Sequence, residues 1–247
     1  MPKYTELAGR VVLVTGGANG IGAAMVRAFA AAKSRVYFCD VDVKAGRALA
    51  GELSDATFAR VDLTIERDVC RWVSDIASRH SKIHVLVNNA ASDPRIPLPK
   101  TTVKDWDDLF ARNLRSYFLA AREASKFMPP GASIVNFGSI TFHIAPAAMT
   151  AYVSTKGGVL GLTRSLAREL GPRRIRVNTI SPGWIMTERQ LRQYVTPAVK
   201  RLIRRSQCIP DLIQPKDIAE IALYLASDGS IAITGQEILA DRGWQFS

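Results

Sequence analysis

The sequence predicts an α/β fold, in which a single doubly wound domain carries a seven-stranded parallel sheet with helices on both faces. Two observations lead to this prediction. Runs that suit strands alternate with runs that suit helices along the whole 247-residue chain, as expected of a sheet built from βα units. The first strand-like run, 10–14 (RVVLV), is continuously apolar after its arginine, as expected of a parallel strand buried on both faces. No repeat or linker divides residues 1–247, so we expect one domain.

The individual elements follow from these runs in order. The expected strands are 10–14, 35–39, 57–61, 83–87, 133–137, 175–180 and 237–240. The expected helices are 21–33, 44–53, 66–79, 103–128, 150–170 and 216–226. The long helix 103–128 is expected to end at Pro129-Pro130-Gly131 and helix 150–170 at Gly171-Pro172, because proline interrupts a helix.

The chain is basic, with 33 Lys and Arg against 22 Asp and Glu and a net charge of +11. Most of this charge is interleaved with acids, but six basic residues and no acid fall in one stretch: Arg189, Arg192, Lys200, Arg201, Arg204 and Arg205. We interpret the stretch as a solvated helix face or as a cationic substrate lid at about 187–210, over an anionic or strongly polar small molecule. No nucleic-acid partner is expected, because no binding motif or aromatic stacking pattern accompanies the charge.

The remaining bulk features predict a cytoplasmic protein. No apolar stretch is long enough to cross a bilayer, and the first residues lack the apolar core of a signal peptide. The three cysteines, Cys39, Cys70 and Cys208, are scattered and suit neither a disulfide framework nor a metal site. The three histidines show no ligand spacing, so no metal is expected.

A glycine-rich turn follows the first strand and predicts dinucleotide binding. The segment Thr15–Gly22 (TGGANGIG) leads directly into a helix, and its glycines permit a tight turn and close backbone approach to a pyrophosphate at the helix N-terminus. Asp40 ends the next strand, about 20 residues on, where a carboxylate would bind the adenosine ribose hydroxyls. It would also repel a 2′-phosphate, so NAD is expected over NADP.

Tyr152 and Lys156 are four residues apart, which places both on one face of a helix. A phenol with a pKa near ~10 is a poor base at neutral pH. A neighbouring ammonium lowers that pKa, so that the tyrosine can exchange a proton with an alcohol or carbonyl. Ser139 follows strand 133–137 and can hydrogen-bond the same oxygen. The Tyr-x-x-x-Lys spacing alone is a weak signal.

Together these motifs resemble the short-chain dehydrogenase/reductase family over essentially the full length of the chain. The matches are Thr15–Gly22, Asp62, Asn88-Asn89-Ala90, Asn113, Ser139, Tyr152, Lys156, Pro182-Gly183 and Thr187. The resemblance implies a Rossmann fold and a homotetramer assembled through helices 103–128 and 150–170 and the C-terminal strand. Two departures are Ala91, where the family usually has glycine, and Asp241-Arg242-Gly243 in place of Asp-Gly-Gly. Ala91 is expected to tighten the site floor and Arg242 to alter a subunit contact.

The resemblance also implies residue roles. Tyr152 would be the general acid/base, Ser139 would orient the substrate oxygen, and Lys156 would lower the tyrosine pKa and bind the nicotinamide ribose. Asn113 would hold a water that links the lysine to solvent. The implied cofactor-binding residues are Gly16, Asn19, Gly20, Ile21, Gly22, Asp40, Asp62, Leu63, Asn89, Ala90, Tyr152, Lys156, Pro182, Gly183, Ile185 and Thr187.

Several segments resemble the branch of the family that oxidises sugars and sugar acids, such as aldose 1-dehydrogenases and deoxy-keto-aldonate dehydrogenases. They include 88–95, 136–140, 182–190, 207–210 and 241–244. The resemblance implies a small polar substrate, a sugar or sugar acid, whose hydroxyl gives a hydride to NAD. Candidate substrate contacts are Asp93, Arg95, Ser139, His143, Tyr152, Trp184, Arg189 and Gln190.

Three alternatives stay open at this point. The first is a 3-oxoacyl or general carbonyl reductase, against which Asp40 argues because reductive roles usually use NADPH. The second is a non-catalytic dinucleotide sensor, and the third is a nucleic-acid-associated protein. The complete set of Asn113, Ser139, Tyr152 and Lys156 argues against both, because neither needs the tyrosine.

Overall fold

The computed structural model describes residues 4–246 and places seven strands in one sheet. The strands are β1 (Val11–Thr15), β2 (Arg35–Asp40), β3 (Ala56–Arg60), β4 (Val85–Asn88), β5 (Ser133–Phe137), β6 (Arg176–Pro182) and β7 (Glu237–Ala240). All neighbouring pairs are parallel, in the order β3-β2-β1-β4-β5-β6-β7. The predicted doubly wound α/β fold with a seven-stranded parallel sheet is confirmed.

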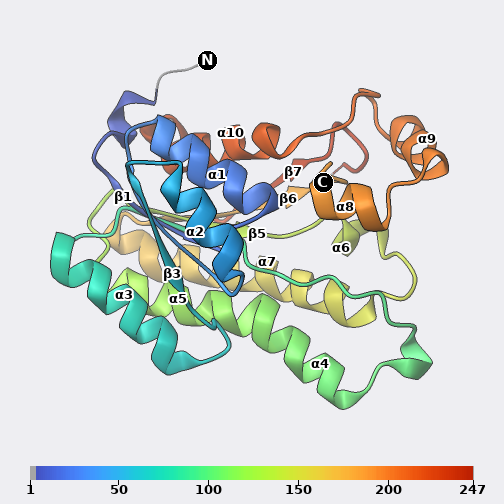
Figure 1. The fold of residues 1–247 in the computed structure, drawn as a ribbon, viewed down its shortest axis with the longest axis horizontal. Helices are drawn as coiled ribbons and strands as arrows, with labels where there is room; N and C mark the ends of the chain where they lie inside the picture. Colours follow the sequence, from blue (N-terminus) through green and yellow to red (C-terminus); the bar gives the residue numbers. More distant parts are fainter. Residues whose placement is uncertain (1–3, 247) are drawn as a thin grey trace.

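Helices cover both faces of this sheet (Figure 1). They are α1 (Gly20–Ala31), α2 (Val43–Gly51), α3 (Glu66–His80), α4 (Val103–Phe110), α5 (Ser116–Ser125), α6 (Thr141–Ile144), α7 (Thr150–Leu170), α8 (Glu188–Gln193), α9 (Pro197–Ser206) and α10 (Pro215–Ala226). Helices α1, α2 and α10 lie on one side, and α3, α5 and α7 on the other (Figure 1). Helices α8 and α9 project beyond one end of the sheet. No helix in the described part of the chain has the length and apolar character needed to cross a membrane.

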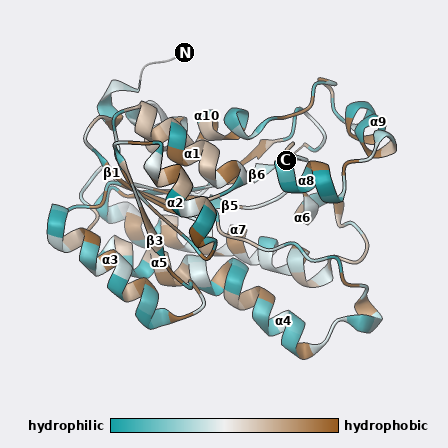
Figure 2. Cartoon of the chain, in the orientation of Figure 1, coloured by the Kyte–Doolittle hydropathy of each residue, from teal (hydrophilic) through white to brown (hydrophobic). Residues whose placement is uncertain are grey.

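The continuous apolar character of β1 follows from its position between two cores. Val12 and Val14 pack with α1 and α10 in one cluster, whereas Val11 and Leu13 pack with α3 and α5 in the other. Because successive side chains of a strand point to opposite faces, a strand covered by helices on both sides is apolar at every position. Figure 2 shows hydrophobic residues along the strands and hydrophilic ones on the outer helices.

The prediction of one continuous helix over 103–128 is wrong, because the region is divided into three segments. The residues form α4, a π-helical segment at Ala111–Arg115, and α5, which ends at Ser125. A π-helical turn accommodates one extra residue and is often found at functional sites. Here it contains Asn113, which is fully buried. No local sequence signal distinguishes such a turn from regular helix, and α6 was likewise not expected.

The strand order reverses direction between β1 and β4, which are neighbours in the sheet. The chain builds outward from β1 to β3 and then returns to place β4 on the other side of β1. Crevices at such switch points, beyond the carboxyl ends of the strands, are where open α/β sheets bind ligands. The predicted site residues follow these strand ends.

Candidate active site

The turn between β1 and α1 accepts only glycine at key positions. Gly16 and Gly20 have φ angles of +64° and +54°, which L-residues rarely adopt. A Cβ on Gly22 would lie 1.9 Å from the carbonyl oxygen of Gly16. Asn19 precedes α1 without capping it through its side chain, so the first N–H groups of the helix are left for another acceptor. This cradle fits the pyrophosphate of a dinucleotide.

Asn89 joins the two strands at the switch point. Its Nδ2 donates to the carbonyl oxygens of Gly16 at 2.9 Å and Thr15 at 3.1 Å. The backbone N–H groups of Asn89 and Ala90 both donate to Thr15 Oγ1. These bonds fix the glycine turn against the loop after β4.

Two carboxylates lie at the ends of β2 and β3. Asp40 accepts hydrogen bonds from the backbone N–H of Ala18 at 3.0 Å and of Asp42 at 3.1 Å. Asp62 accepts from the hydroxyl and N–H of Thr64, and these bonds hold the pKa of its carboxyl below the usual value. Asp40 therefore lies directly against the glycine turn, as the sequence predicts for a ribose-binding acid.

The segment after β6 lies next to the same turn. Gly183 donates its N–H to the carbonyl of Ala240, and Ile185 is buried against Ile213. Thr187 caps α8 by accepting from the N–H of Gln190. A Cβ on Gly20 would lie 3.1 Å from Thr187 Cγ2, so the start of the lid contacts the glycine turn.

Tyr152 and Lys156 lie one turn apart on α7. Lys156 is 2% exposed, its Nζ donates to the carbonyl of Phe137 at 2.7 Å, and it lies 5.5 Å from the centroid of the Tyr152 ring. Burial raises the pKa of Tyr152 well above its usual value, Asp93 raises it further, and the Ser139 hydrogen bond and Arg189 oppose the rise. In this structure the pKa of Tyr152 is therefore raised, opposite to the lowering expected from a neighbouring ammonium.

Burial lowers the pKa of Lys156 from 10.5 to about 7, against the opposing effect of Asp93. Between those two pH values the unfolded chain holds a proton on this lysine that the folded chain does not. The free energy of unfolding therefore rises with pH across the window, by at most about 1.4 kcal/mol per pH unit. Burial of Lys156 therefore costs no ionisation free energy above pH 10.5, and the cost grows to its full value as pH falls to about 7.

We expect Lys156→Met to remove this pH dependence. The difference in unfolding free energy between wild type and variant, measured by urea denaturation from pH 7 to 9 without added nucleotide, should change with pH in favour of the wild type. Lys104→Met on the surface of α4 is the control, and its curve should parallel that of the wild type. Parallel curves for Lys156→Met would contradict a lowered lysine pKa.

Asn113 connects the tyrosine helix to the loop after β4. Its Nδ2 donates to the carbonyl of Ser92 at 2.8 Å and to Thr155 Oγ1 at 3.3 Å, and its Oδ1 accepts from the N–H of Ser92 at 2.8 Å. Thr155 lies between Tyr152 and Lys156 in sequence. The side chain of Asn113 therefore links the Ser92 loop to α7, and its role in holding a water stays a prediction.

The predicted substrate contacts form a connected cluster between that loop and the lid. Arg189 forms an ion pair with Asp93, and Gln190 donates from Nε2 to the second Asp93 oxygen at 3.2 Å. Trp184 donates from its indole N–H to Gln190 Oε1 at 3.1 Å. The Arg95 guanidinium lies 4.1 Å from the ring centroid of Tyr194 and 5.5 Å from that of Trp184. Tyr194 was not predicted, since nothing in the sequence links it to Arg95.

His143, the remaining candidate, does not join this cluster. Its Nε2 lies 2.9 Å from Glu237 Oε1 on β7, and the hydroxyl of Ser181 donates to the same oxygen at 2.5 Å. A Cβ on Gly138 would lie 2.3 Å from Ser181 Oγ. Glu237 thus binds α6 through His143, and Ser181 packs against the Gly138-Ser139 turn. Sequence reading missed both residues because they are far from His143 in the chain.

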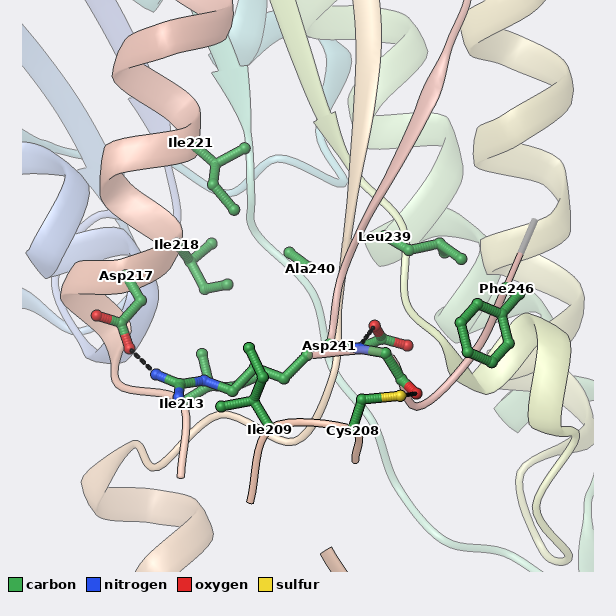
Figure 3. Close-up of a pocket in the computed structure, with 12 residues that line it drawn as sticks. Cys208, Ile209, Ile213, Asp217, Ile218, Ile221, Leu239, Ala240, Asp241 and Phe246 are labelled. Carbon is green, nitrogen blue, oxygen red and sulfur yellow. Dashed lines mark hydrogen bonds and ion pairs between the residues drawn. The ribbon is translucent and has the colours of Figure 1, made fainter. Parts of the chain in front are cut away.

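An open apolar cavity of about 510 Å³ lies at the C-terminal edge of the sheet, between α10, β7 and the end of the lid (Figure 3). Ile209, Ile218, Leu239 and Phe246 are among its lining residues, and none of the predicted catalytic residues lines it. Arg242 lies at this cavity and pairs with Asp211 at 3.2 Å and Asp217 at 3.6 Å. The cavity is therefore separate from the tyrosine site.

Comparisons with known proteins agree with this geometry. The family model described as "Enoyl-(Acyl carrier protein) reductase" matches residues 16–245. "Probable galactose dehydrogenase GalD" of Rhizobium meliloti (strain 1021) is 39% identical, covering 98% of this chain and 97% of its own length. D-xylose 1-dehydrogenase of Caulobacter vibrioides is 35% identical, covering 98% of both. A solved dehydrogenase/reductase from Sinorhizobium meliloti 1021 superimposes with a TM-score of 0.92 at 29% identity, covering 98% of each chain. The chain therefore belongs to the short-chain dehydrogenase/reductase family.

Proposed function

We propose that this protein is an NAD-dependent dehydrogenase that oxidises a hydroxyl of a sugar or sugar acid. The observation that carries the proposal is a polar cluster beside the tyrosine helix. Asp93 lies on the loop that hydrogen-bonds to Asn113, and Arg189 and Gln190 of α8 bind its carboxylate. Such side chains suit hydroxyl groups, whereas a steroid or acyl chain needs an apolar lining. The relatives named as galactose and xylose dehydrogenases support the same class.

In the proposed reaction, Tyr152 accepts the proton of the substrate hydroxyl and Ser139 hydrogen-bonds the same oxygen. Lys156 in its charged form stabilises the phenolate and binds the nicotinamide ribose. Asn113 holds the Ser92 loop against α7 through its hydrogen bonds to Ser92 and Thr155. When bound, the nicotinamide supplies the acceptor for the substrate hydride. The protein otherwise contributes position and proton transfer.

The cofactor of this family is a nicotinamide dinucleotide. Its phosphates would lie at Gly16, Asn19, Gly20, Ile21 and Gly22, with the adenosine end at Asp40, Asp62 and Leu63. The nicotinamide end would lie at Asn89, Ala90, Pro182, Gly183, Ile185 and Thr187. We propose NAD over NADP, because the carboxylate of Asp40 beside the turn would repel a 2′-phosphate.

We expect the wild type to use NAD with a kcat/KM at least about 100-fold above that for NADP, the equivalent of about 2.7 kcal/mol. Asp40→Ala should narrow this preference by about tenfold, since it removes the charge that repels the extra phosphate. Steady-state kinetics with both cofactors measure the ratio. Asp75→Ala on α3 is the control. An unchanged ratio in Asp40→Ala would show that another residue selects the cofactor.

A substrate panel tests the main proposal. Aldoses, sugar acids, an acyl thioester and a steroid are each incubated with the protein and NAD, and reduced cofactor is followed by absorbance. Turnover of sugars supports the proposal. Turnover confined to the acyl thioester or the steroid would overturn it in favour of a 3-oxoacyl or general carbonyl reductase.

We also propose that residues 1–247 act as one cytoplasmic domain and assemble as a homotetramer. β7 is one of the two edge strands of the sheet, and Phe246 beside it is 79% exposed next to the apolar cavity (Figure 3). Exposed apolar surface of this kind is typical of subunit interfaces. Light scattering coupled to gel filtration measures the mass in solution, and a monomer would contradict the proposal.

A further inference from the structure

The lid contains six cations, and one of them, which acts on the Tyr152 pKa, has an acidic partner. Arg189 is the lid cation that acts on the Tyr152 pKa, and its guanidinium is paired with Asp93. Within residues 4–246, the other five, Arg192, Lys200, Arg201, Arg204 and Arg205, form no ion pair, and all but the half-buried Lys200 are exposed. The lid cation that acts on the tyrosine is therefore already paired with a carboxylate.

Asp93 is the less exposed member of this ion pair. Its side chain is 15% exposed, against 50% for that of Arg189. Both of its oxygens are engaged, one by Arg189 and the other by Gln190. The residue before it, Ser92, is held at its N–H and its carbonyl by the buried side chain of Asn113. The carboxylate is thus held in position from the catalytic side by the loop and from the lid side by α8.

The charge of Asp93 reaches the predicted catalytic pair. It raises the pKa of Tyr152 and opposes the lowering of the Lys156 pKa, which are the effects of a nearby negative charge on each group. The cation Arg95 is exposed and lies over the rings of Tyr194 and Trp184. A substrate carboxylate that entered the site would be repelled by the charge of Asp93. It would not gain an ion pair with Arg189, because Arg189 already pairs with Asp93.

Hydroxyl groups have no such difficulty, because each can donate to a carboxylate and accept from a guanidinium or an amide. We propose that Asp93 is a specificity-determining residue that selects a neutral polyhydroxylated sugar over the sugar acid of the same stereochemistry. The proposal rests on the sugar dehydrogenase function proposed above and narrows its substrate class to neutral sugars. It assigns Arg189 the secondary task of holding Asp93 in place.

The test compares matched substrate pairs, galactose with galacturonate and glucose with glucuronate, in the holoenzyme. For at least one pair, the wild type should show a kcat/KM about tenfold or more higher for the neutral sugar, a difference of about 1.4 kcal/mol. Asp93→Asn retains the shape of the side chain and one accepting oxygen, which can keep the bond from Gln190, but it removes the charge and frees Arg189. It should lower the neutral-to-acid ratio by about tenfold or more. Asp75→Asn, an exposed acid on α3, is the matched control and should leave the ratio unchanged.

Two further variants sharpen the result. Arg189→Gln removes the ion pair of Asp93 and should increase the discrimination against the sugar acid. The double variant Asp93→Asn/Arg189→Gln should lose the gain in uronate turnover, because that gain comes from the freed arginine. If Asp93→Asn does not fold, Arg189→Gln alone decides the sign of the effect.

The outcomes separate the two proposals. Turnover of the sugars with an unchanged ratio in Asp93→Asn, or a wild type that prefers the uronates, would overturn the role of Asp93 and leave the sugar dehydrogenase intact. No turnover of any sugar in the panel by the wild type would overturn the proposed function, and the role of Asp93 with it.

Discussion

Replacing Tyr152 by phenylalanine is expected to reduce kcat by about 10²–10⁴-fold, the usual contribution of general acid–base catalysis. The substitution removes one oxygen and retains the half-buried ring, so the packing around α7 is kept. Because the proton of the substrate hydroxyl then has no acceptor, the chemical step should be lost while binding is kept. Single-turnover kinetics give the rate, and isothermal titration gives the affinity for NAD.

The affinity for NAD should stay within about tenfold of the wild type, since a phenolic hydroxyl adds at most one hydrogen bond to the cofactor site. Tyr224→Phe on α10 loses the same atom far from the site and serves as the control. Unchanged turnover in Tyr152→Phe would remove the tyrosine from the chemistry. A protein that binds NAD and turns over nothing, with or without Tyr152, would instead be a dinucleotide sensor.

Gly22→Ala is expected to have the second large effect. The added Cβ would lie 1.9 Å from the carbonyl oxygen of Gly16 and 2.8 Å from Asn89 Nδ2, so the backbone of the turn must move. Overpacking of this kind costs about 1–3 kcal/mol or more. The same movement breaks the bonds through which Asn89 holds the turn, so the Kd for NAD should rise by about tenfold or more.

Thermal unfolding and isothermal titration measure the two consequences of Gly22→Ala separately. Gly51→Ala is a matched control, because a Cβ at Gly51 meets no atom within 4 Å. This variant should be as stable as the wild type or slightly more so, since alanine favours a helix over glycine. Wild-type affinity in Gly22→Ala would show that the turn is not the phosphate cradle.

The sheet was predictable from sequence because each strand is marked by the apolar residues of its own short run. A run such as 11–14 is apolar at every position only if both faces of the strand are covered, and the intervening helices supply that cover. The glycine turn was predictable for the same reason, since Gly16 and Gly20 need backbone angles that other residues avoid. Local chemistry of this kind leaves a pattern within a few residues.

Contacts between distant parts of the chain leave no such pattern. Asp93 and Arg189 were each chosen as substrate contacts, but the ion pair between them spans 96 residues and had no local signal. His143 was expected to face the substrate, and its contact with Glu237 could not be inferred before β7 was placed next to β6. The π-helical turn at Asn113 is also determined by tertiary packing, because its residues suit a regular helix equally well.

The carboxylate of Glu237 has a consequence for how the protein is made. It joins α6, through His143, to the end of β6, through Ser181, yet it belongs to β7, which pairs only with β6 at the edge of the sheet. Chains are synthesised from the N-terminus, so the strands that carry the glycine turn emerge long before β7 does. A nascent chain therefore acquires its nucleotide cradle first and its fully supported serine turn last.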